Sequence, residues 1–467
     1  MRKTKIIATL GPATDSSEIL GRMIDAGMNI ARLNMSHAKH DWVRRVVKDI
    51  RELAAARKIS VGILMDTQGP AIRTGDLKNV LDLKPGGKFT FTVRGEKSEE
   101  ESSVDVNYEN FVNDINVGDT VLLDNGEIQM KVLKKFANKI ECEVLTPGKL
   151  GSRRHINLPG VKVSLPALTG KDLQDVALGL ELGVDYIALS FVREAKDIRQ
   201  LKAVVANAKH KPLIVAKIED QQAVKNLKEI IQESDALMIA RGDLGIEVPY
   251  EELPIIQRRA VKHCLHIGKP VIVATHMLES MIENPIPTRA EVTDVANAVY
   301  EQADAIMLSG ETTVGKYPLK CLEVFDRVAQ RIERSGGANF QERAELTNQR
   351  EMLVKSAVVM ADELKAAAIL VFTLSGTSAR YAAWMRPRHS PIYAICDTQQ
   401  VADSLTLNWG VRPIVIPFEH SNREKTISRS IEKLVEQKLL GKGNTVVVIS
   451  SITVDGQTVK AVQMREV

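Results

Sequence analysis

The chain has 467 residues, too many for one ordinary hydrophobic core, so its length predicts roughly two to four domains. Hydrophobic residues make up 44% and charged residues 26%, as is usual for a globular protein. The 63 Lys and Arg residues against 59 Asp and Glu leave a formal net charge of +4, so no basic footprint for nucleic acid exists. No apolar run reaches the roughly 18 residues of a membrane helix, so we expect no membrane partner.

The four cysteines give no sign of a metal site or a disulfide framework. They lie at positions 142, 264, 321 and 396, and none forms a CxxC pair, which argues against zinc and dithiol sites. Reduced thiols in a cytoplasmic protein are the simplest interpretation. The first residues, MRKTKIIATLGPATD, contain too short an apolar run for a signal peptide, so we interpret them as a first strand.

Eight segments share one pattern, in which a short apolar and β-branched run ends in polar residues and is followed by a helical stretch. Buried strands that alternate with helices are typical of a parallel sheet covered on both faces. Eight such units predict an α/β fold of the (β/α)8 TIM barrel type. The segments are 4–12, 29–37, 60–70, 185–193, 213–220, 236–245, 270–277 and 305–313.

A long gap separates the third of these strands from the fourth. Within it, GKFTFTVRG and DTVLLDNGEIQMKVL alternate apolar and polar residues and contain turn signals such as Asp124-Asn125-Gly126, which is typical of antiparallel strands. We therefore expect a small β-barrel domain over residues 70–165, inserted as a lid into a catalytic barrel formed by residues 1–69 and 166–337.

The last third of the chain predicts a separate domain. The polar stretch GGANFQERAELTNQRE follows the last barrel helix and is typical of a linker. Strands such as AAILVFTLS and NTVVVIS then alternate with helices such as KTISRSIEKLVEQKLL. We expect a C-terminal α/β domain over residues 338–467.

Polar residues at the ends of the barrel strands should meet, because the carboxyl ends of the strands build the active site of such barrels. Residues i and i+2 of a strand point to the same side. In LIVAKIED, Lys217 and Glu219 should therefore face the barrel mouth together, whereas Asp220 should face away. The same rule joins Arg32 with Asn34 and Ser36, Arg241 with Asp243, and Ser309 with Glu311, while Asp66 and Thr275 close their own strands.

The chemistry of these residues suits a phosphorylated substrate. Glu219 and Asp243 follow neighbouring strands, and Mg²⁺ favours one or two carboxylates together with phosphate oxygens. Lys217 and Arg32 supply positive charge for a phosphoryl group. The backbone N–H groups of the turn ARGDLG could hold a substrate carboxylate at a helix start. Oxygen donors that suit a second hard cation are Asn34, Ser36, Asp66 and Thr67.

Several long motifs resemble the pyruvate kinase family. They follow the family's order from residue 4 to about 318, and include TKIIATLGPAT, GMNIARLNMSH, MDTQGPAIRTG, AKIED, MIARGDLGIEVP and ATHMLESMIENPIPTRAEVTDVANAV. The resemblance implies transfer of a phosphoryl group from phosphoenolpyruvate to ADP, which gives pyruvate and ATP in glycolysis. It also implies a homotetramer with a regulatory C-terminal domain.

The resemblance further implies roles for single residues. Glu219 and Asp243 match the ligands of Mg²⁺ or Mn²⁺, Lys217 matches the residue that stabilises the transferring phosphoryl group and the enolate, and Arg32 also contacts phosphate. At the substrate-carboxylate turn, the matches are Ala240, Arg241, Gly242 and Asp243, and Thr275 matches a residue near the face where the enolate is protonated, with Ser309 as a further catalytic hydroxyl. The matches on the nucleotide side are Asn34, His37 and Arg73. The matches to the ligands of K⁺ are Asn34, Ser36, Asp66 and Thr67.

Four positions depart from the family pattern. Gln68 and Glu194 both stand where Lys is common, and Glu194 predicts weaker nucleotide contacts. Ala71 stands where potassium-requiring members usually carry Glu and potassium-independent members carry Lys. We still expect a monovalent cation to bind, because all four oxygen ligands are present. His276 replaces the usual Gln and is either a group that titrates near neutral pH or a packed neighbour.

The segment FTLSGTSARY follows a strand and opens a helix in the C-terminal domain. Hydroxyls and N–H groups at a helix start form an anion cradle, although plain N-capping uses the same residues. In the family this loop receives a phosphate of an allosteric effector, which here implicates Thr373, Ser375, Gly376, Thr377 and Ser378. The C-terminus lacks the family's Gly-x-Thr-Asn signature, so a sugar monophosphate, AMP or no effector stays open beside a bisphosphate.

Two other functions fit parts of the pattern. A metal-dependent aldolase or lyase could use Glu219 and Asp243, but it would not need the inserted domain, Lys217 or Arg73. A non-catalytic sensor could keep only the effector site. The strand-end residues of the expected active site are intact, which argues against such a sensor. An ordinary polar barrel mouth explains any single residue, but burying Lys217 beside Glu219 costs several kcal/mol unless the two are paired or bound to ions.

Overall fold

The central domain is a closed barrel of eight parallel strands. The computed structural model describes residues 2–93, 102–419, 422–454 and 457–467. The strands pair in the order β1-β16-β15-β14-β13-β12-β3-β2, and β2 pairs back with β1, so the predicted (β/α)8 barrel is confirmed. Their bounds are β1 Lys5–Thr9, β2 Ile30–Asn34, β3 Gly62–Asp66, β12 Tyr186–Leu189, β13 Leu213–Ile218, β14 Ala236–Ala240, β15 Val271–Ala274 and β16 Ala305–Leu308.

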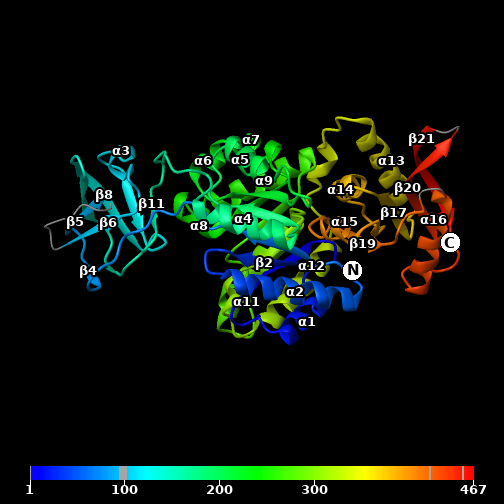
Figure 1. Cartoon of the computed structure of the whole chain (residues 1–467), viewed down its shortest axis with the longest axis horizontal. Coiled ribbons are helices and arrows are strands. Elements are labelled where there is room, and N and C mark those ends of the chain that lie inside the picture. The colour runs from blue at the N-terminus through cyan, green and yellow to red at the C-terminus, as the bar shows by residue number, and fades with distance from the viewer. Residues whose placement is uncertain (1, 94–101, 420–421, 455–456) are drawn as a thin grey trace.

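Helices follow the barrel strands and cover the outside of the sheet (Figure 1). Local signals set their ends: Thr169 and Asp172 form a capping box at the start of α4, and Gly183, with φ 64°, ends it. The bounds are α1 Ser17–Asp25, α2 His40–Arg57, α4 Gly170–Leu182, α5 Ala195–Val205, α6 Gln221–Lys225, α7 Leu227–Glu233, α8 Arg241–Glu247, α9 Leu253–Ile267, α10 Arg289–Tyr300, α11 Gly310–Thr313 and α12 Pro318–Glu333.

Side chains of one parity fill the barrel interior. Ile7, Leu64, Ala188 and Val215 are fully buried members of a cluster to which all eight strands contribute. Successive side chains alternate between the two faces of a strand. A residue two positions after an interior residue, near the carboxyl end of the strand, therefore also points toward the barrel axis. The interior cluster therefore identifies which strand-end residues line the mouth.

The inserted domain is built mainly of β-strands around its own apolar core. A six-stranded sheet, β11-β7-β8-β9-β5-β6, and a two-stranded sheet, β10-β4, enclose a cluster that includes Phe89, Phe91 and Phe111. Buried residues alternate with exposed ones along β8 and with partly buried ones along β9, as the sequence pattern predicted. The bounds are β4 Leu81–Leu83, β5 Lys88–Val93, β6 Ser103–Val106, α3 Phe111–Asp114, β7 Thr120–Leu123, β8 Ile128–Lys135, β9 Lys139–Val144, β10 Gly148–Leu150 and β11 Ile156–Asn157.

The C-terminal domain is a five-stranded sheet flanked by helices. Its strands lie in the order β19-β18-β17-β20-β21. The first four are parallel, and β21 runs antiparallel to β20, which the sequence pattern did not predict. The bounds are α13 Gln349–Glu363, β17 Ala368–Thr373, α14 Thr377–Trp384, β18 Ile392–Cys396, α15 Gln399–Asp403, β19 Val411–Val415, α16 Arg423–Glu436, β20 Thr445–Val454 and β21 Gln457–Glu466.

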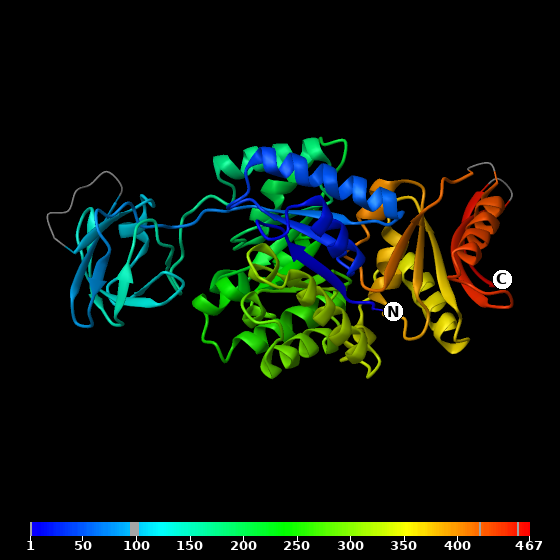
Figure 2. The same ribbon diagram turned by 90° about the horizontal axis from the view of Figure 1, so that it is seen from below.

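The inserted domain and the C-terminal domain lie at opposite ends of the barrel (Figures 1 and 2). The C-terminal domain meets the amino ends of the barrel strands, where Lys5 Nζ donates to the carbonyl of Val411 at 2.5 Å. From this domain Leu407 also enters the interior cluster of the barrel. The carboxyl ends of the strands are therefore left facing the inserted domain.

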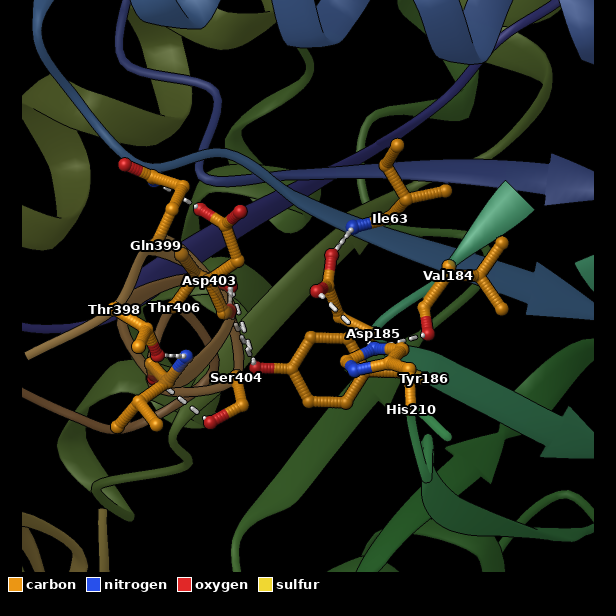
Figure 3. A network of polar contacts seen from close by, with 12 residues as sticks. Ile63, Val184, Asp185, Tyr186, His210, Thr398, Gln399, Asp403, Ser404 and Thr406 are labelled. Carbon is orange, nitrogen blue, oxygen red and sulfur yellow. Dashed lines mark hydrogen bonds and ion pairs between the residues drawn. The ribbon is translucent and has the colours of Figure 1, made fainter. Parts of the chain in front are cut away.

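A polar network joins the barrel to the C-terminal domain at the start of β12 (Figure 3). The hydroxyl of Tyr186 lies 3.3 Å from that of Thr406. Arg51 of α2 donates to the carboxylates of Asp185 and Asp403, at 2.9 Å in both cases. Burial raises the pKa of both carboxyl groups, that of Asp403 to about 6, in spite of Arg51. The guanidinium of Arg51 is therefore ion-paired with two buried carboxylates, one from the barrel and one from the C-terminal domain.

Within the described residues, every helix is too short or too polar to cross a membrane. All four cysteines are buried and unpaired, as the sequence predicted. Burial raises the pKa of the Cys142, Cys321 and Cys396 thiols to about 12, so these thiols are unreactive at neutral pH.

We expect Arg51→Met to lower the thermal stability of the protein by several degrees. The substitution leaves Asp185 and Asp403 buried without their cation, and removing one partner of a buried ion pair costs about 3–5 kcal/mol. Melting monitored by circular dichroism at pH 8 measures the change. Arg44→Met on the same helix is the matched control, because Arg44 pairs with Glu181 at the surface and exposed pairs contribute little. Equal melting temperatures for the two variants would contradict the expectation.

Candidate active site

Four charged side chains form one buried network at the barrel mouth. Lys217 Nζ lies 3.1 Å from Asp66 Oδ1 and 2.8 Å from Glu219 Oε1. Arg32 Nε donates to Asp66 Oδ2 at 2.7 Å, and Arg32 Nη1 donates to Thr9 Oγ1 at 2.9 Å. The four charged residues are at most 9% exposed. The expectation that Lys217 and Glu219 face the mouth together is confirmed.

Lys217 and Asp66 hold their charges against burial. Burial alone disfavours the ammonium of Lys217, but the carboxylates of Asp66 and Glu219 outweigh it and raise its pKa above the usual value. Burial likewise opposes the charge of Asp66, but Arg32 and Lys217 outweigh it and lower the pKa of that carboxyl. The mouth therefore contains fixed positive charge in surroundings with little water, where charge acts strongly.

Glu219 differs from Asp66 because the charge of a second acid, Asp243, acts on it. Burial raises the pKa of its carboxyl, Lys217 opposes this shift, and Asp243 adds to it. Two carboxylates that raise each other's energy form a donor set that fits a divalent cation. Among the described residues no group of three or more acids, histidines or cysteines comes together, so substrate oxygens would have to complete the coordination of Mg²⁺.

A cavity of about 300 Å³ contains a second set of the predicted residues. Asp243, Thr275 and Ser309 line it together with Asn125, which belongs to the inserted domain. The buried Ser309 hydroxyl has no hydrogen-bond partner within the described part of the chain, so its donor and acceptor are available to a bound group. The inserted domain thus reaches the barrel mouth in this structure.

Thr275 is held in an unusual backbone conformation. Its φ is 68° and that of His276 is 52°, both in the left-handed region that β-branched residues rarely adopt. Thr275 Oγ1 accepts from the N–H of Gly242 at 2.6 Å and donates to the carbonyl of Ala274 at 2.6 Å. These two bonds fix the hydroxyl beside the first turn of α8.

The parity expectation for Arg241 and Asp243 is wrong. β14 ends at Ala240 and α8 begins at Arg241, so both residues lie on a helix, where positions i and i+2 diverge. Arg241 is buried and directed toward α10, with Nη1 2.7 Å from Asp294 Oδ1. The side chain of Arg241 is therefore not in the mouth, and only the main chain of 240–242 can meet a substrate.

Ser309 and Glu311 both line the cavity of about 300 Å³, as expected, but strand parity is not the reason. β16 ends at Leu308, and Glu311 belongs to α11. The Glu311 carboxylate accepts from the N–H of Ser309 at 2.7 Å and from that of Leu278 at 3.0 Å. Glu311 therefore holds the turn that presents the Ser309 hydroxyl.

The predicted ligands of a monovalent cation lie on adjoining strand ends. Asn34 is the register partner of Asp66 across β2 and β3. Asn34 Oδ1 accepts from the N–H of Ser36 at 3.1 Å, and Thr67 Oγ1 accepts from the N–H of Ser190 at 3.1 Å. Ser36 lies in the turn after β2, so it does not continue the strand as parity assumed. The set still supplies neighbouring oxygens that fit a hard cation.

Two predicted nucleotide-side residues lie apart from the charged network. His37 is exposed in the turn after β2. Arg73 is exposed at the start of the inserted domain, where its Nη1 donates to the carbonyl of Arg153 at 3.2 Å. Within the described residues, neither His37 nor Arg73 is hydrogen-bonded or ion-paired to the network.

Sequence reasoning missed Ser190 and Asn125. Ser190 has the same parity as the interior residue Ala188, and its hydroxyl lies 2.8 Å from Lys217 Nζ. Parity would have found it, but the apolar residues that follow conceal the end of the strand. Asn125 was interpreted only as a turn residue, and no local signal indicates that this turn meets the barrel.

Comparison with known proteins agrees with this arrangement. Residues 1–322 match the family model described as "Pyruvate kinase, barrel domain", and residues 351–460 match the model described as "Pyruvate kinase, alpha/beta domain". The chain belongs to the pyruvate kinase family. Pyruvate kinases transfer the phosphoryl group of phosphoenolpyruvate to ADP, and the chain is a phosphotransferase of this kind.

Several curated and solved pyruvate kinases are similar over nearly the whole chain. The pyruvate kinase of Staphylococcus epidermidis is 38% identical over 97% of this chain and 78% of its own length. Isozyme G of Nicotiana tabacum, a chloroplastic pyruvate kinase, is 41% identical over 96% of this chain and 80% of its own. A crystal structure of a pyruvate kinase from Cryptosporidium parvum matches with a TM-score of 0.93 and 34% identity, over 99% of this chain and 96% of that one.

The departures from the pyruvate kinase pattern have simple surroundings. His276 Nε2 lies 3.4 Å from Glu279 Oε2, and both side chains are more than half exposed. Glu194 caps α5 and pairs with Lys196 at 2.5 Å. The Ala71 N–H donates to the carbonyl of Gly69 at 3.1 Å, so the main chain of Ala71 belongs to the turn after β3. Its side chain brings no charge to this turn.

The loop of residues 373–378 borders a cavity of about 240 Å³ at the start of α14. Thr373 Oγ1 accepts from the N–H of Gly376 at 2.9 Å, and the hydroxyls of Ser375 and Thr377 lie 2.9 Å apart. The cavity is also lined by Ser378 and by three cationic side chains that were not predicted, Arg350, Arg423 and Lys460.

Proposed function

We propose that the phosphoryl group passes from phosphoenolpyruvate to ADP at the network of Arg32, Asp66, Lys217 and Glu219. The observation that carries this proposal is the ammonium of Lys217, which two buried carboxylates hold charged at the barrel mouth. Preorganised charge in a site with little water stabilises the charge that develops in a transition state. Arg32, on the opposite side of Asp66, supplies the second cation for the phosphate.

Glu219 and Asp243 would hold Mg²⁺, or Mn²⁺ in its place. When bound, such an ion supplies Lewis-acid charge to the phosphoryl oxygens. Phosphoryl transfer needs positioning and charge neutralisation more than a covalent nucleophile. The bond from phosphorus to the enol oxygen breaks, and a terminal oxygen of ADP forms the new bond, while Lys217 and Arg32 hold the oxygens in place. Asn34, His37 and Arg73 are proposed to contact the nucleotide.

The second cavity is proposed to hold the pyruvate part of the substrate. Its carboxylate would lie at the turn formed by Ala240, Arg241 and Gly242, at the start of α8. The enolate that remains after transfer takes a proton at its methylene carbon and becomes pyruvate. Thr275 and Ser309, whose hydroxyl has no hydrogen-bond partner among the described residues, line this cavity and can orient the water that brings the proton.

We expect Lys217→Met to abolish pyruvate formation and to leave the fold intact. The substitution keeps the buried stem but removes the charge that stabilises the phosphoryl group and the enolate. A coupled assay for pyruvate, with phosphoenolpyruvate and ADP, measures the loss against a circular dichroism spectrum. Lys269→Met is the control, because Lys269 is a half-buried barrel lysine bonded to the carbonyl of Ser234. Full activity of Lys217→Met would refute the role of Lys217.

A monovalent cation, K⁺, is proposed to bind at Asn34, Ser36, Asp66 and Thr67. Adjoining oxygens in the structure support it. Ala71 adds no charge there. The site therefore has neither a lysine that could replace the cation nor a glutamate that could balance its charge. The expected result is higher activity with K⁺ than with tetramethylammonium at constant ionic strength. Equal activity under both conditions would refute a monovalent cation site.

The C-terminal cavity is proposed to regulate the enzyme by binding a phosphorylated effector. The hydroxyls of the loop and the cations Arg350, Arg423 and Lys460 support a phosphate ligand. We expect at least one member of a panel of sugar monophosphates, AMP and a sugar bisphosphate to activate pyruvate formation. Arg423→Ala should weaken that response and leave the unactivated rate unchanged. A panel without any response would contradict the proposal.

Three further features are proposed by analogy with the family. The inserted domain closes over the mouth, which the contact of Asn125 with the second cavity supports. The enzyme is a homotetramer. It works in the cytoplasm, which its four unpaired thiols support.

A further inference from the structure

Ser190 lies at the meeting point of two parts of the proposed site. It follows β12, is 2% exposed, and stands between β13, which carries Lys217, and β3, which ends in Asp66. Its hydroxyl lies 2.8 Å from Lys217 Nζ, 3.2 Å from Asp66 Oδ1 and 2.7 Å from the carbonyl oxygen of Thr67. Its N–H donates to Thr67 Oγ1 at 3.1 Å.

The directions of these bonds follow from the available protons. A serine hydroxyl has one proton and two lone pairs. Lys217 can only donate, so Ser190 accepts from Lys217, and its single proton goes to the shortest remaining acceptor, the carbonyl of Thr67. The hydroxyl therefore transmits the position of the Thr67 main chain to the Lys217 ammonium.

The ammonium of Lys217 has three protons, and all three are engaged. Two go to the carboxylates of Asp66 and Glu219, and the third goes to the neutral hydroxyl of Ser190. A hydrogen bond to a neutral oxygen is weaker than one to a carboxylate. When a phosphoryl oxygen arrives, the bond to Ser190 is therefore the one that Lys217 can exchange at the lowest cost.

We propose that Ser190 is a positioning residue, which holds the ammonium of Lys217 in place until a phosphoryl oxygen takes over its third N–H, and which links Lys217 to the cation ligands at the end of β3. The inference rests on the roles proposed above for Lys217 and for Asp66 and Thr67. Binding of a monovalent cation at Thr67 fixes the carbonyl to which Ser190 donates. The same hydroxyl then holds Lys217 in line.

Ser190→Ala tests the positioning role. We expect kcat to fall about 10- to 100-fold, as is usual when a hydrogen bond to a charged group is lost, while KM for phosphoenolpyruvate changes less than about 3-fold. Ser190→Thr keeps the hydroxyl and should recover most of the loss. Ser234→Ala is the matched control, because Ser234 is a fully buried barrel serine whose hydroxyl bonds the carbonyl of Ile231, away from the mouth.

A second measurement, the effect of K⁺ on the melting temperature, tests the link between Ser190 and the cation site independently of activity. The rise in melting temperature on exchanging tetramethylammonium for K⁺, at constant ionic strength, should be smaller in Ser190→Ala than in the natural protein and unchanged in Ser234→Ala. A wild-type kcat in Ser190→Ala, an equal loss in Ser234→Ala, or an unaltered K⁺ shift in Ser190→Ala would each overturn the inference. Activity retained in Lys217→Met would instead overturn the role of Lys217 itself.

Discussion

The ammonium of Lys217 between two buried carboxylates is the interaction on which the active site depends. Four consecutive strands of the barrel, β13, β12, β3 and β2, end at the same height and contribute Lys217, Ser190, Asp66 and Arg32. None of the three charged residues of this set could be buried alone, because each charge needs the others to offset its loss of water. A closed barrel satisfies the requirement, since it holds neighbouring strand ends at a fixed spacing and register.

Much of the fold could be predicted because the barrel strands are covered on both faces. Such strands are nearly continuous apolar runs, and the helices between them begin and end with recognisable caps such as Thr169 and Gly183. β21 was missed because QTVKAVQMRE carries many polar residues on an edge strand, which resembles a tail more than a strand. The inserted sheet was predicted from alternation, which β8 and β9 display.

The site could be predicted only as far as the strands extend. Parity correctly predicts that Lys217 and Glu219 share a side, because Glu219 keeps the alternation of the strand one residue beyond the end of β13. It fails at Arg241, because a helix begins where the strand was assumed to continue. Ser190 keeps the parity of the interior residue Ala188 but was missed, because Phe191 takes a left-handed φ of 53° directly afterwards and the apolar sequence gives no sign that the strand ends there. Backbone turns at strand ends, and contacts between domains such as that of Asn125, depend on tertiary packing rather than on local sequence.

Leu407 gives the C-terminal domain a direct mechanical part in the barrel. The base of the barrel is closed by a side chain from another domain, packed against interior residues such as Ile7 and Tyr186. Protein interiors are close-packed and pass displacement on rather than absorb it. A rotation of the C-terminal domain would therefore displace Leu407 at the amino ends of the same strands whose carboxyl ends carry the proposed active site. Communication between effector and substrate would then run along the barrel axis, through its core, and would need no change in the surface helices.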